Sequence, residues 1–161
     1  MPNIQCIIAD YQNPQHGSDL VFLLNSYALD PMGGGEPLNK DVQEGLPHAL
    51  AQRPHAMSIL CYVDDQPAGL INTFEGFSTF KCKPLINIHD VVVHKDFRGL
   101  KLSQVMLDYL ENIAREKGCC KLTLEVIEGN KVAQNAYNKF GFSGYEMDPQ
   151  FGQAMFWEKA L

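Results

Sequence analysis

The chain has 161 residues, of which 45% are hydrophobic and 20% charged, and its formal net charge is −6. These values are typical of one globular domain with a substantial core, so we expect a single domain over residues 1–161. The acidic balance argues against nucleic acid or an anionic membrane surface as a partner. No apolar run approaches the roughly 20 residues of a membrane span, and no signal peptide is visible at the N-terminus.

Five cysteines are present, and no two of them form a Cys-x-x-Cys pair. Most of them lie in apolar runs, which favours reduced, buried thiols in a cytoplasmic protein. The histidines and cysteines are not clustered, so we expect no metal site. The cysteines are Cys6, Cys61, Cys82, Cys119 and Cys120.

The first half of the chain alternates between strand and helix patterns. Ser18 or Asp19 could cap the first helix, and the second helix is expected to be interrupted near Gly45 and Pro47. Proline and three glycines make residues 30–37 a loop. The patterns predict strands at residues 3–9, 55–63 and 68–75, the last two forming a hairpin, and helices at 17–29 and 38–52.

The second half begins with a loop at residues 76–84 and contains the strongest helix pattern of the chain. That helix is expected to stop at Gly118, and the next helix at Gly141, because glycine commonly ends helices. The patterns predict strands at residues 85–94, 121–127, 142–147 and 153–159, and helices at 100–117 and 131–140.

The order of these elements predicts the architecture. Short turns join the early strands, which implies antiparallel pairing, whereas a helix of crossover length joins the strands at 85–94 and 121–127. The fold class is therefore α/β (α+β), with a mixed, mostly antiparallel, seven-stranded sheet flanked by helices. A C-terminal hairpin exposed at the end of this sheet makes a homodimer plausible.

Residues 88–142 carry two motifs. Arg98-Gly99-Leu100-Lys101-Leu102-Ser103 follows a strand and opens a helix, and Asn130, Ala133, Tyr137, Gly141 and Phe142 follow the next strand with fixed spacing. Together they resemble the GCN5-related N-acetyltransferase (GNAT) superfamily, over essentially the whole chain. The second signature is matched in full, whereas Lys101 and Ser103 replace small residues of the first.

The resemblance implies a GNAT-type fold and acetyl-CoA as cosubstrate, bound without a metal. The strand residues would pair with the pantetheine arm, and the opening of the helix would hold the pyrophosphate. The implied cofactor-binding residues are Val91, Val92, Val93, Arg98, Gly99, Leu100, Lys101, Leu102, Ser103, Asn130, Ala133 and Tyr137.

Elementary chemistry fits this assignment. The first N–H groups of a helix lack helical partners, and its dipole places about half a positive charge there, so an anion is stabilised. A glycine would let the backbone approach phosphate closely. We expect the Lys101 N–H still to bind, with its side chain turned outward or on an outer phosphate.

The resemblance makes Tyr137 the acid that meets the departing CoA thiolate. The acceptor amine also needs a base, because it is neutral in only about one molecule in 2,500 at pH 7. The candidates are His89, Asp90 and Glu75, with Glu125 as a further and weaker one, and His89 is favoured because histidine titrates near neutral pH. Strand alternation predicts that His89 and Asp90 point to opposite faces, with His89 sharing the parity of Val91 and Val93.

The acceptor pocket is expected between the first helix-loop-helix and the loop at 76–84. Carboxylates among aromatic rings suit a cation, so a primary amine of a small molecule is the favoured substrate. Acetylation of a protein or peptide amine, and a non-catalytic acyl-CoA sensor, stay open as alternatives. The expected lining is Tyr27, Asp30, Met32, Glu36, Phe77 and Phe80.

Overall fold

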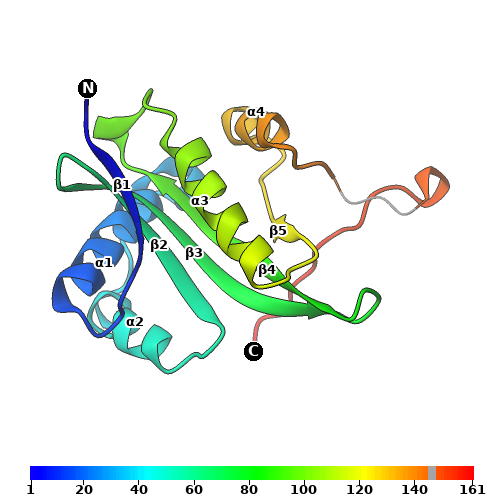
Figure 1. The fold of residues 1–161 in the computed structure, drawn as a ribbon, viewed down its shortest axis with the longest axis horizontal. Helices are drawn as coiled ribbons and strands as arrows, with labels where there is room; N and C mark the ends of the chain where they lie inside the picture. Colours follow the sequence, from blue (N-terminus) through cyan, green and yellow to red (C-terminus); the bar gives the residue numbers. More distant parts are fainter. Residues whose placement is uncertain (145–147) are drawn as a thin grey trace. The chain divides into compact units, whose positions relative to one another are not determined.

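The protein is described here by a computed structural model that covers residues 1–144 and 148–161. The chain forms two compact units, Met1–Ile127 and Glu128–Leu161. The first unit contains a five-stranded sheet in the order β1-β2-β3-β4-β5 (Figure 1). Its strands are β1 (Ile4–Ile8), β2 (Ala56–Val63), β3 (Gln66–Ser78), β4 (Lys83–Val93) and β5 (Leu122–Leu124).

The predicted pairing of the strands is confirmed. β1 to β4 pair antiparallel, and β4 pairs parallel with β5. The β2–β3 hairpin turns through Asp64 and Asp65, whose φ angles are 48° and 65°. A two-residue turn with positive φ at both positions matches the twist of the flanking strands, and aspartate tolerates this conformation.

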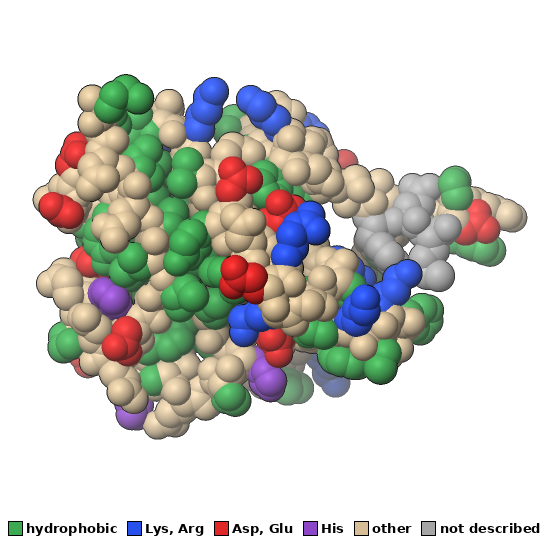
Figure 2. Space-filling view, in the orientation of Figure 1, with side chains coloured by type: hydrophobic (Ala, Val, Ile, Leu, Met, Phe, Trp, Pro, Cys, Tyr) green, Lys and Arg blue, Asp and Glu red, His purple; other side chains and the backbone are tan. Residues whose placement is uncertain are grey.

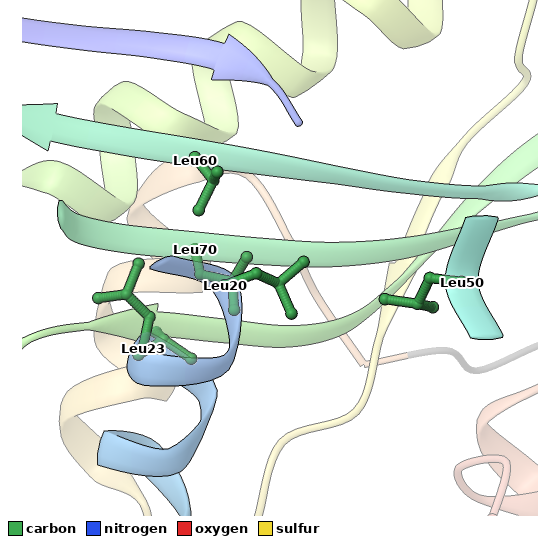
Figure 3. Packing of buried hydrophobic residues seen from close by; sticks show 6 residues of the cluster. Leu20, Leu23, Leu50, Leu60 and Leu70 are labelled. Carbon is green, nitrogen blue, oxygen red and sulfur yellow. The ribbon is translucent and has the colours of Figure 1, made fainter. Parts of the chain in front are cut away.

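Helices cover both faces of this sheet (Figure 1). On one face lie α1 (Pro14–Leu29) and α2 (Lys40–Ala51), separated by the short 3-10 helix η1 (Pro31–Gly33). Leucines from these helices and from the middle strands form a buried cluster (Figure 3). Its buried members are Leu20, Leu23, Leu50, Leu60, Leu70 and Val92.

The other face is covered by α3 (Leu102–Glu116), which packs closely where β3 has a glycine. A Cβ atom at Gly69 would lie 2.8 Å from the Met106 Sδ, so this position admits no larger side chain without displacement of the methionine. The outer surface of α3 carries interspersed acidic and basic side chains (Figure 2), as expected for a helix with one buried face.

The start of α1 differs from the prediction. Asn13 is the cap, since its side chain accepts hydrogen bonds from the N–H groups of Gln15 and His16, and Pro14 occupies the first turn. Asp19, a predicted cap, is instead buried inside the helix and accepts a hydrogen bond from the Tyr62 hydroxyl at 2.7 Å. The stronger signal was the Asn-Pro pair, which is typical of a helix start.

The expected interruption of the second helix is wrong, because α2 continues through Gly45 and Pro47. A Cβ atom at Gly17 would lie only 3.1 Å from Pro47, so the proline ring packs directly on α1 at a position without a side chain. This contact offsets part of the cost of the backbone hydrogen bond that a proline removes inside a helix.

The loop expected at 76–84 is also wrong in its bounds. β3 runs to Ser78 and β4 begins at Lys83, with register pairs from Gly76↔Leu85 to Ser78↔Lys83. Cross-strand pairing therefore overrides the weak strand propensity of the local sequence. The connection is reduced to residues 79–82.

The second unit contains α4 (Lys131–Phe140), at the predicted residues, and the 3-10 helix η3 (Pro149–Phe151). The expected strand at 142–147 lies partly outside the described residues. Residues 142–144 and the expected strand at 153–159 have no strand structure, so the seven-stranded sheet is corrected to five strands among the residues that the structure describes. Apolar residues alone do not make a strand where no ladder partner is present. The homodimer, which rested on this hairpin, stays a prediction.

We predict that Asn13→Ala lowers the free energy of unfolding by about 1 kcal/mol, because the cap of α1 is lost. Asn39→Ala is the matched control, since Asn39 stands at the start of α2 without a side-chain capping bond. Urea denaturation of both variants measures the difference. Equal losses in the two variants would contradict the assigned role of Asn13.

Candidate active site

A bulge in β4 defines the candidate site. Asn72 of β3 pairs with Asp90, whereas the next residue, Thr73, pairs with Ile88, so His89 is an extra residue on β4. A bulge of this kind interrupts the alternation of side chains between the two faces. The expectation that His89 and Asp90 point to opposite faces assumed an unbroken strand.

Both side chains lie on the face covered by α1 and α2. Asp90 shares this face with its partner Asn72, which alternates in phase with Leu70 of the leucine cluster. The His89 ring meets the Phe74 ring edge-on at 5.7 Å, and Phe74 packs against the same cluster. The prediction of opposite faces is therefore wrong, and the bulge is the reason.

The two side chains are also in contact. The His89 Nδ1 lies 3.2 Å from the Asp90 Oδ2. An ionised carboxylate only accepts hydrogen bonds, so this contact favours the tautomer of His89 that carries its proton on Nδ1 and its lone pair on Nε2. The His89 side chain is 65% exposed, whereas that of Asp90 is 20% exposed. The arrangement is an exposed imidazole in contact with a less exposed carboxylate.

Tyr27 and Asp30 approach this pair from the end of α1. Burial raises the pKa of the Tyr27 hydroxyl, and the negative charges of Asp90 and then Asp30 raise it further. The Asp30 Oδ2 also forms an ion pair with Arg98 at 3.3 Å. The structure thus brings four predicted residues, Tyr27, Asp30, His89 and Asp90, to one region of the first unit.

The loop after β4 has the geometry expected of an anion-binding helix start. α3 begins at Leu102, two residues later than predicted, and Lys101 precedes it without a side-chain capping bond. Lys101 adopts a left-handed conformation with φ 58°, next to Gly99 with φ 89°. Lys101 therefore adopts a left-handed backbone conformation that favours glycine, at a cost of about 1–2 kcal/mol.

The strand predicted at 121–127 is wrong in its bounds, because β5 ends at Leu124 and its pairing with β4 stops before this loop. The parallel register covers only Ile86, Ile88 and the residue between them, while β4 continues to Val93. On the β5 side, within the described part of the chain, the stretch Val91–Val93 has no strand partner. Its backbone groups are thus available to an extended ligand, and Val92, with 2% exposure, anchors the stretch to the core.

Other predicted residues lie elsewhere. Glu75 follows Thr73 and Ile71 on the face of α3, where it pairs with His55 at 3.6 Å and Lys117 at 4.0 Å. These groups line a cavity of about 240 Å³. Glu75 is therefore on the opposite side of the sheet from His89, and its role as a base stays a prediction.

The predicted lining is only partly brought together. Phe77 and Phe80 are 59% and 90% exposed at the tip of the β3–β4 hairpin. Phe77 lies four residues beyond Thr73, or about 13 Å along the strand from the bulge, and Phe80 follows in the connection to β4. Met32 is in η1, and Glu36 is exposed in the loop that follows it. The assignment of these four residues to the substrate stays a prediction.

Three predicted residues belong to the second unit. The Asn130 side chain caps α4 by accepting from the Ala133 N–H at 3.2 Å. Tyr137 lies seven residues further along α4, so Asn130, Ala133 and Tyr137 share a helix face. The Tyr137 ring meets the Phe142 ring edge-on at 6.0 Å. Their contacts with cofactor stay predictions.

Sequence reasoning missed the polar residues beneath the bulge. Asn72 and Ser58 are 5% and 1% exposed, and Asn72 donates to the Asp90 Oδ2 at 3.0 Å. The available signal was an amide and a hydroxyl within otherwise apolar strands, because buried polar groups require partners.

In the described residues, no group of three or more His, Cys, Asp or Glu side chains could hold a metal ion. No helix described here is long and apolar enough to span a membrane.

Comparison with known proteins agrees with this arrangement of a strand, a basic loop and a helix. A profile of the Acetyltransferase (GNAT) family matches residues 21–142. Thialysine N-epsilon-acetyltransferase of Caenorhabditis elegans is 23% identical over 131 residues, which cover 78% of this chain and 76% of that protein.

Solved structures share the fold. A ribosomal-protein-alanine N-acetyltransferase from Brucella melitensis biovar Abortus 2308 has a TM-score of 0.71 at 17% identity, covering 99% of this chain and 98% of that one. An aminoglycoside N-acetyltransferase in complex with CoA has a TM-score of 0.75 at 16% identity, covering 100% and 97%. The fold is that of these acetyltransferases. The chain belongs to the GNAT acetyltransferase family, whose members use acetyl-CoA, which confirms the resemblance seen in the sequence.

We predict that Asp90→Asn lowers the pKa of Tyr27 toward its ordinary value, because the phenolate no longer faces that negative charge. Asp30→Asn should lower it by less, since Asp30 contributes less to the shift. The tyrosinate absorbance is titrated in each protein, and the spectrum of Tyr27→Phe in the same background is subtracted. An unchanged Tyr27 titration in Asp90→Asn would show that the two groups are not neighbours.

We predict that Lys101→Gly raises the free energy of unfolding by about 1 kcal/mol, because glycine adopts positive φ without strain. Lys101→Ala is the matched control: it removes the same charged side chain and retains the Cβ atom. Chemical denaturation compares the two variants. If alanine stabilises as much as glycine, the effect belongs to the side chain and not to the backbone.

Proposed function

We propose that this protein transfers the acetyl group of acetyl-CoA to a primary amine of a small molecule, by direct attack in a ternary complex. The observation that carries the proposal is the bulge, which brings His89 and Asp90 together on the face of α1, just before the loop that opens α3. In this proposal the base, His89, and the first basic residue of the cofactor loop, Arg98, are nine positions apart in the chain.

A base is needed because deprotonation of the acceptor amine is the main energetic cost of the reaction. A primary amine with an ordinary pKa is protonated at pH 7, and deprotonation costs about 4.6 kcal/mol. His89 accepts this proton at Nε2, directly or through a water, while Asp90 holds Nδ1 and stabilises the imidazolium. Histidine suits this role because its ordinary pKa lies near neutral pH.

The chain also offers groups to hold acetyl-CoA, which supplies the activated acetyl group. The N–H groups that open α3, together with Arg98 and Lys101, are suited to the pyrophosphate. The unpaired edge of Val91–Val93 is suited to the amides of the pantetheine arm. In this proposal a backbone N–H near Val92 polarises the thioester carbonyl. Tyr137, Asn130 and Ala133, which belong to the second unit, keep the roles that the family resemblance implies: Tyr137 as the acid for the departing thiolate, and Asn130 and Ala133 as contacts of the cofactor.

The charge around the site favours a cationic acceptor. Asp30 and Asp90 are acidic, and Tyr27 adds an aromatic ring, a combination that attracts ammonium groups. The related proteins named above include acetyltransferases of thialysine and of aminoglycosides, both of which are amines. A ribosomal-protein acetyltransferase shares the fold, so a protein or peptide amine is the second candidate. We place the reaction in the cytoplasm. The expectation of buried thiols is wrong for Cys82 and Cys120, which are exposed, whereas Cys61 is buried.

We predict that the protein releases CoA from acetyl-CoA when small amines are added, and that His89→Gln and Tyr137→Phe each lower kcat by about a hundredfold to ten-thousandfold. His48→Gln and Tyr109→Phe are matched controls, since His48 bonds Gln52 at the end of α2 and Tyr109 lies in α3, both outside the proposed site. Thiol release is followed with diamines, amino acids, aminoglycosides and peptides as acceptors.

The outcomes separate the candidates. Release with peptides alone would support the protein-acetyltransferase alternative. Binding of acetyl-CoA in calorimetry without release by any amine would support a sensor and contradict the proposed reaction.

A further inference from the structure

A chain of hydrogen bonds crosses the sheet beneath the bulge and ends at Asp90. Ser58, Asn72 and Asp90 are directly opposed on β2, β3 and β4, so they form one polar row across three strands. This row lies in the same layer as Leu60 and Leu70, where polar groups are costly unless they are satisfied. The row is therefore part of the packed core, where each polar group needs a hydrogen-bond partner.

The direction of each hydrogen bond can be assigned. Ser58 donates its hydroxyl to the Asn72 Oδ1 at 2.6 Å, and its oxygen lies 2.8 Å from the Tyr11 hydroxyl. Because serine has a single hydroxyl proton, Tyr11 is the donor to Ser58. The Asn72 amide nitrogen then donates to the Asp90 Oδ2 at 3.0 Å. The opposite orientation of the amide would place two oxygens against each other.

The same Asp90 oxygen faces His89. The Oδ2 atom receives the Asn72 N–H and lies 3.2 Å from the His89 Nδ1. Two donors on one oxygen fix the plane and position of the carboxylate. A side-chain amide does not pass protons along the row, so the network holds Asp90 in place and is not a proton wire.

We infer that Asn72 is a positioning residue: by fixing Asp90, it holds His89 in the tautomer that leaves Nε2 free for the acceptor amine. This inference rests on the proposed function for its effect on catalysis, whereas its effect on the imidazole can be measured without any turnover. Ser58 and Tyr11 support the same geometry by orienting the Asn72 amide.

The test uses Asn72→Asp, which keeps the size and shape of the side chain but replaces the N–H donor that faces Asp90 with an oxygen acceptor. The new carboxylate still accepts from Ser58, but it places an oxygen where Asp90 received an N–H. Asn87→Asp is the matched control. Asn87 donates to the Thr123 hydroxyl at 2.9 Å, and that hydroxyl can donate in return when the residue becomes aspartate.

The first measurement is the tautomer of His89. In protein with ¹⁵N-labelled histidine at about pH 8, the His89 signals are assigned by comparison with His89→Gln. We expect the Nδ1-protonated form to dominate in the wild type and in Asn87→Asp. In Asn72→Asp we expect a mixture of both tautomers. Dominance of the Nε2-protonated form in the wild type would overturn the inference.

The second measurement is steady-state kinetics with the best acceptor amine. We expect Asn72→Asp to lower kcat by about tenfold to a hundredfold, a part of what a general base contributes, with the KM for acetyl-CoA changed less than about twofold. Asn87→Asp should leave both parameters within about twofold. Unchanged kcat and unchanged tautomer in Asn72→Asp would overturn the inference.

A second, milder variant tests the same network in case Asn72→Asp fails to fold. Ser58→Ala frees the Asn72 amide without adding charge, and it should change kcat and the tautomer in the same direction by a smaller factor. Thermal unfolding checks that each variant is folded. If the tautomer responds as expected but no amine is acetylated by the wild type, the proposed function fails while the positioning role of Asn72 stands.

Discussion

The candidate site depends on one extra residue in a strand. A regular β4 would direct His89 and Asp90 to opposite faces of the sheet. The bulge against Asn72 and Thr73 brings both side chains to the face of α1, where they touch. The polar centre of the site uses this constraint, because His89, Asp90 and the buried amide of Asn72 all come from neighbouring positions on β3 and β4.

An ion pair joins two loops of opposite charge near this site. Asp30 follows α1 and raises the pKa of Tyr27, while Arg98 precedes α3 in the basic loop. The 3.3 Å ion pair between Asp30 and Arg98 joins these loops across the ends of their helices. Because the pair is exposed, we expect it to contribute little stability. Its significance is spatial, since an acidic region suited to amines adjoins a basic region suited to phosphates.

Much of the fold was predictable from local patterns, and the exceptions have physical reasons. The apolar stripe of α3, the residues of α4 and the β2–β3 hairpin are properties of short segments, which the sequence displays directly. The expected strand at 153–159 failed because a strand requires a partner as well as composition. The sequence indicated several residues of the candidate site, but not that His89 and Asp90 lie on the same face of the sheet. A bulge is a property of pairing between β3 and β4, so the sequence of β4 alone could not reveal it.

The most direct test of this account is the environment of the His89 ring in solution. Nuclear Overhauser spectroscopy of the unliganded protein should detect contacts between His89 ring protons and those of Phe74, whose ring centroid lies 5.7 Å away on the α1 face. Contacts of His89 with Ile71 or Met106 instead would place the ring on the α3 face. That result would mean that β4 alternates regularly, and it would contradict the pairing of His89 with Asp90.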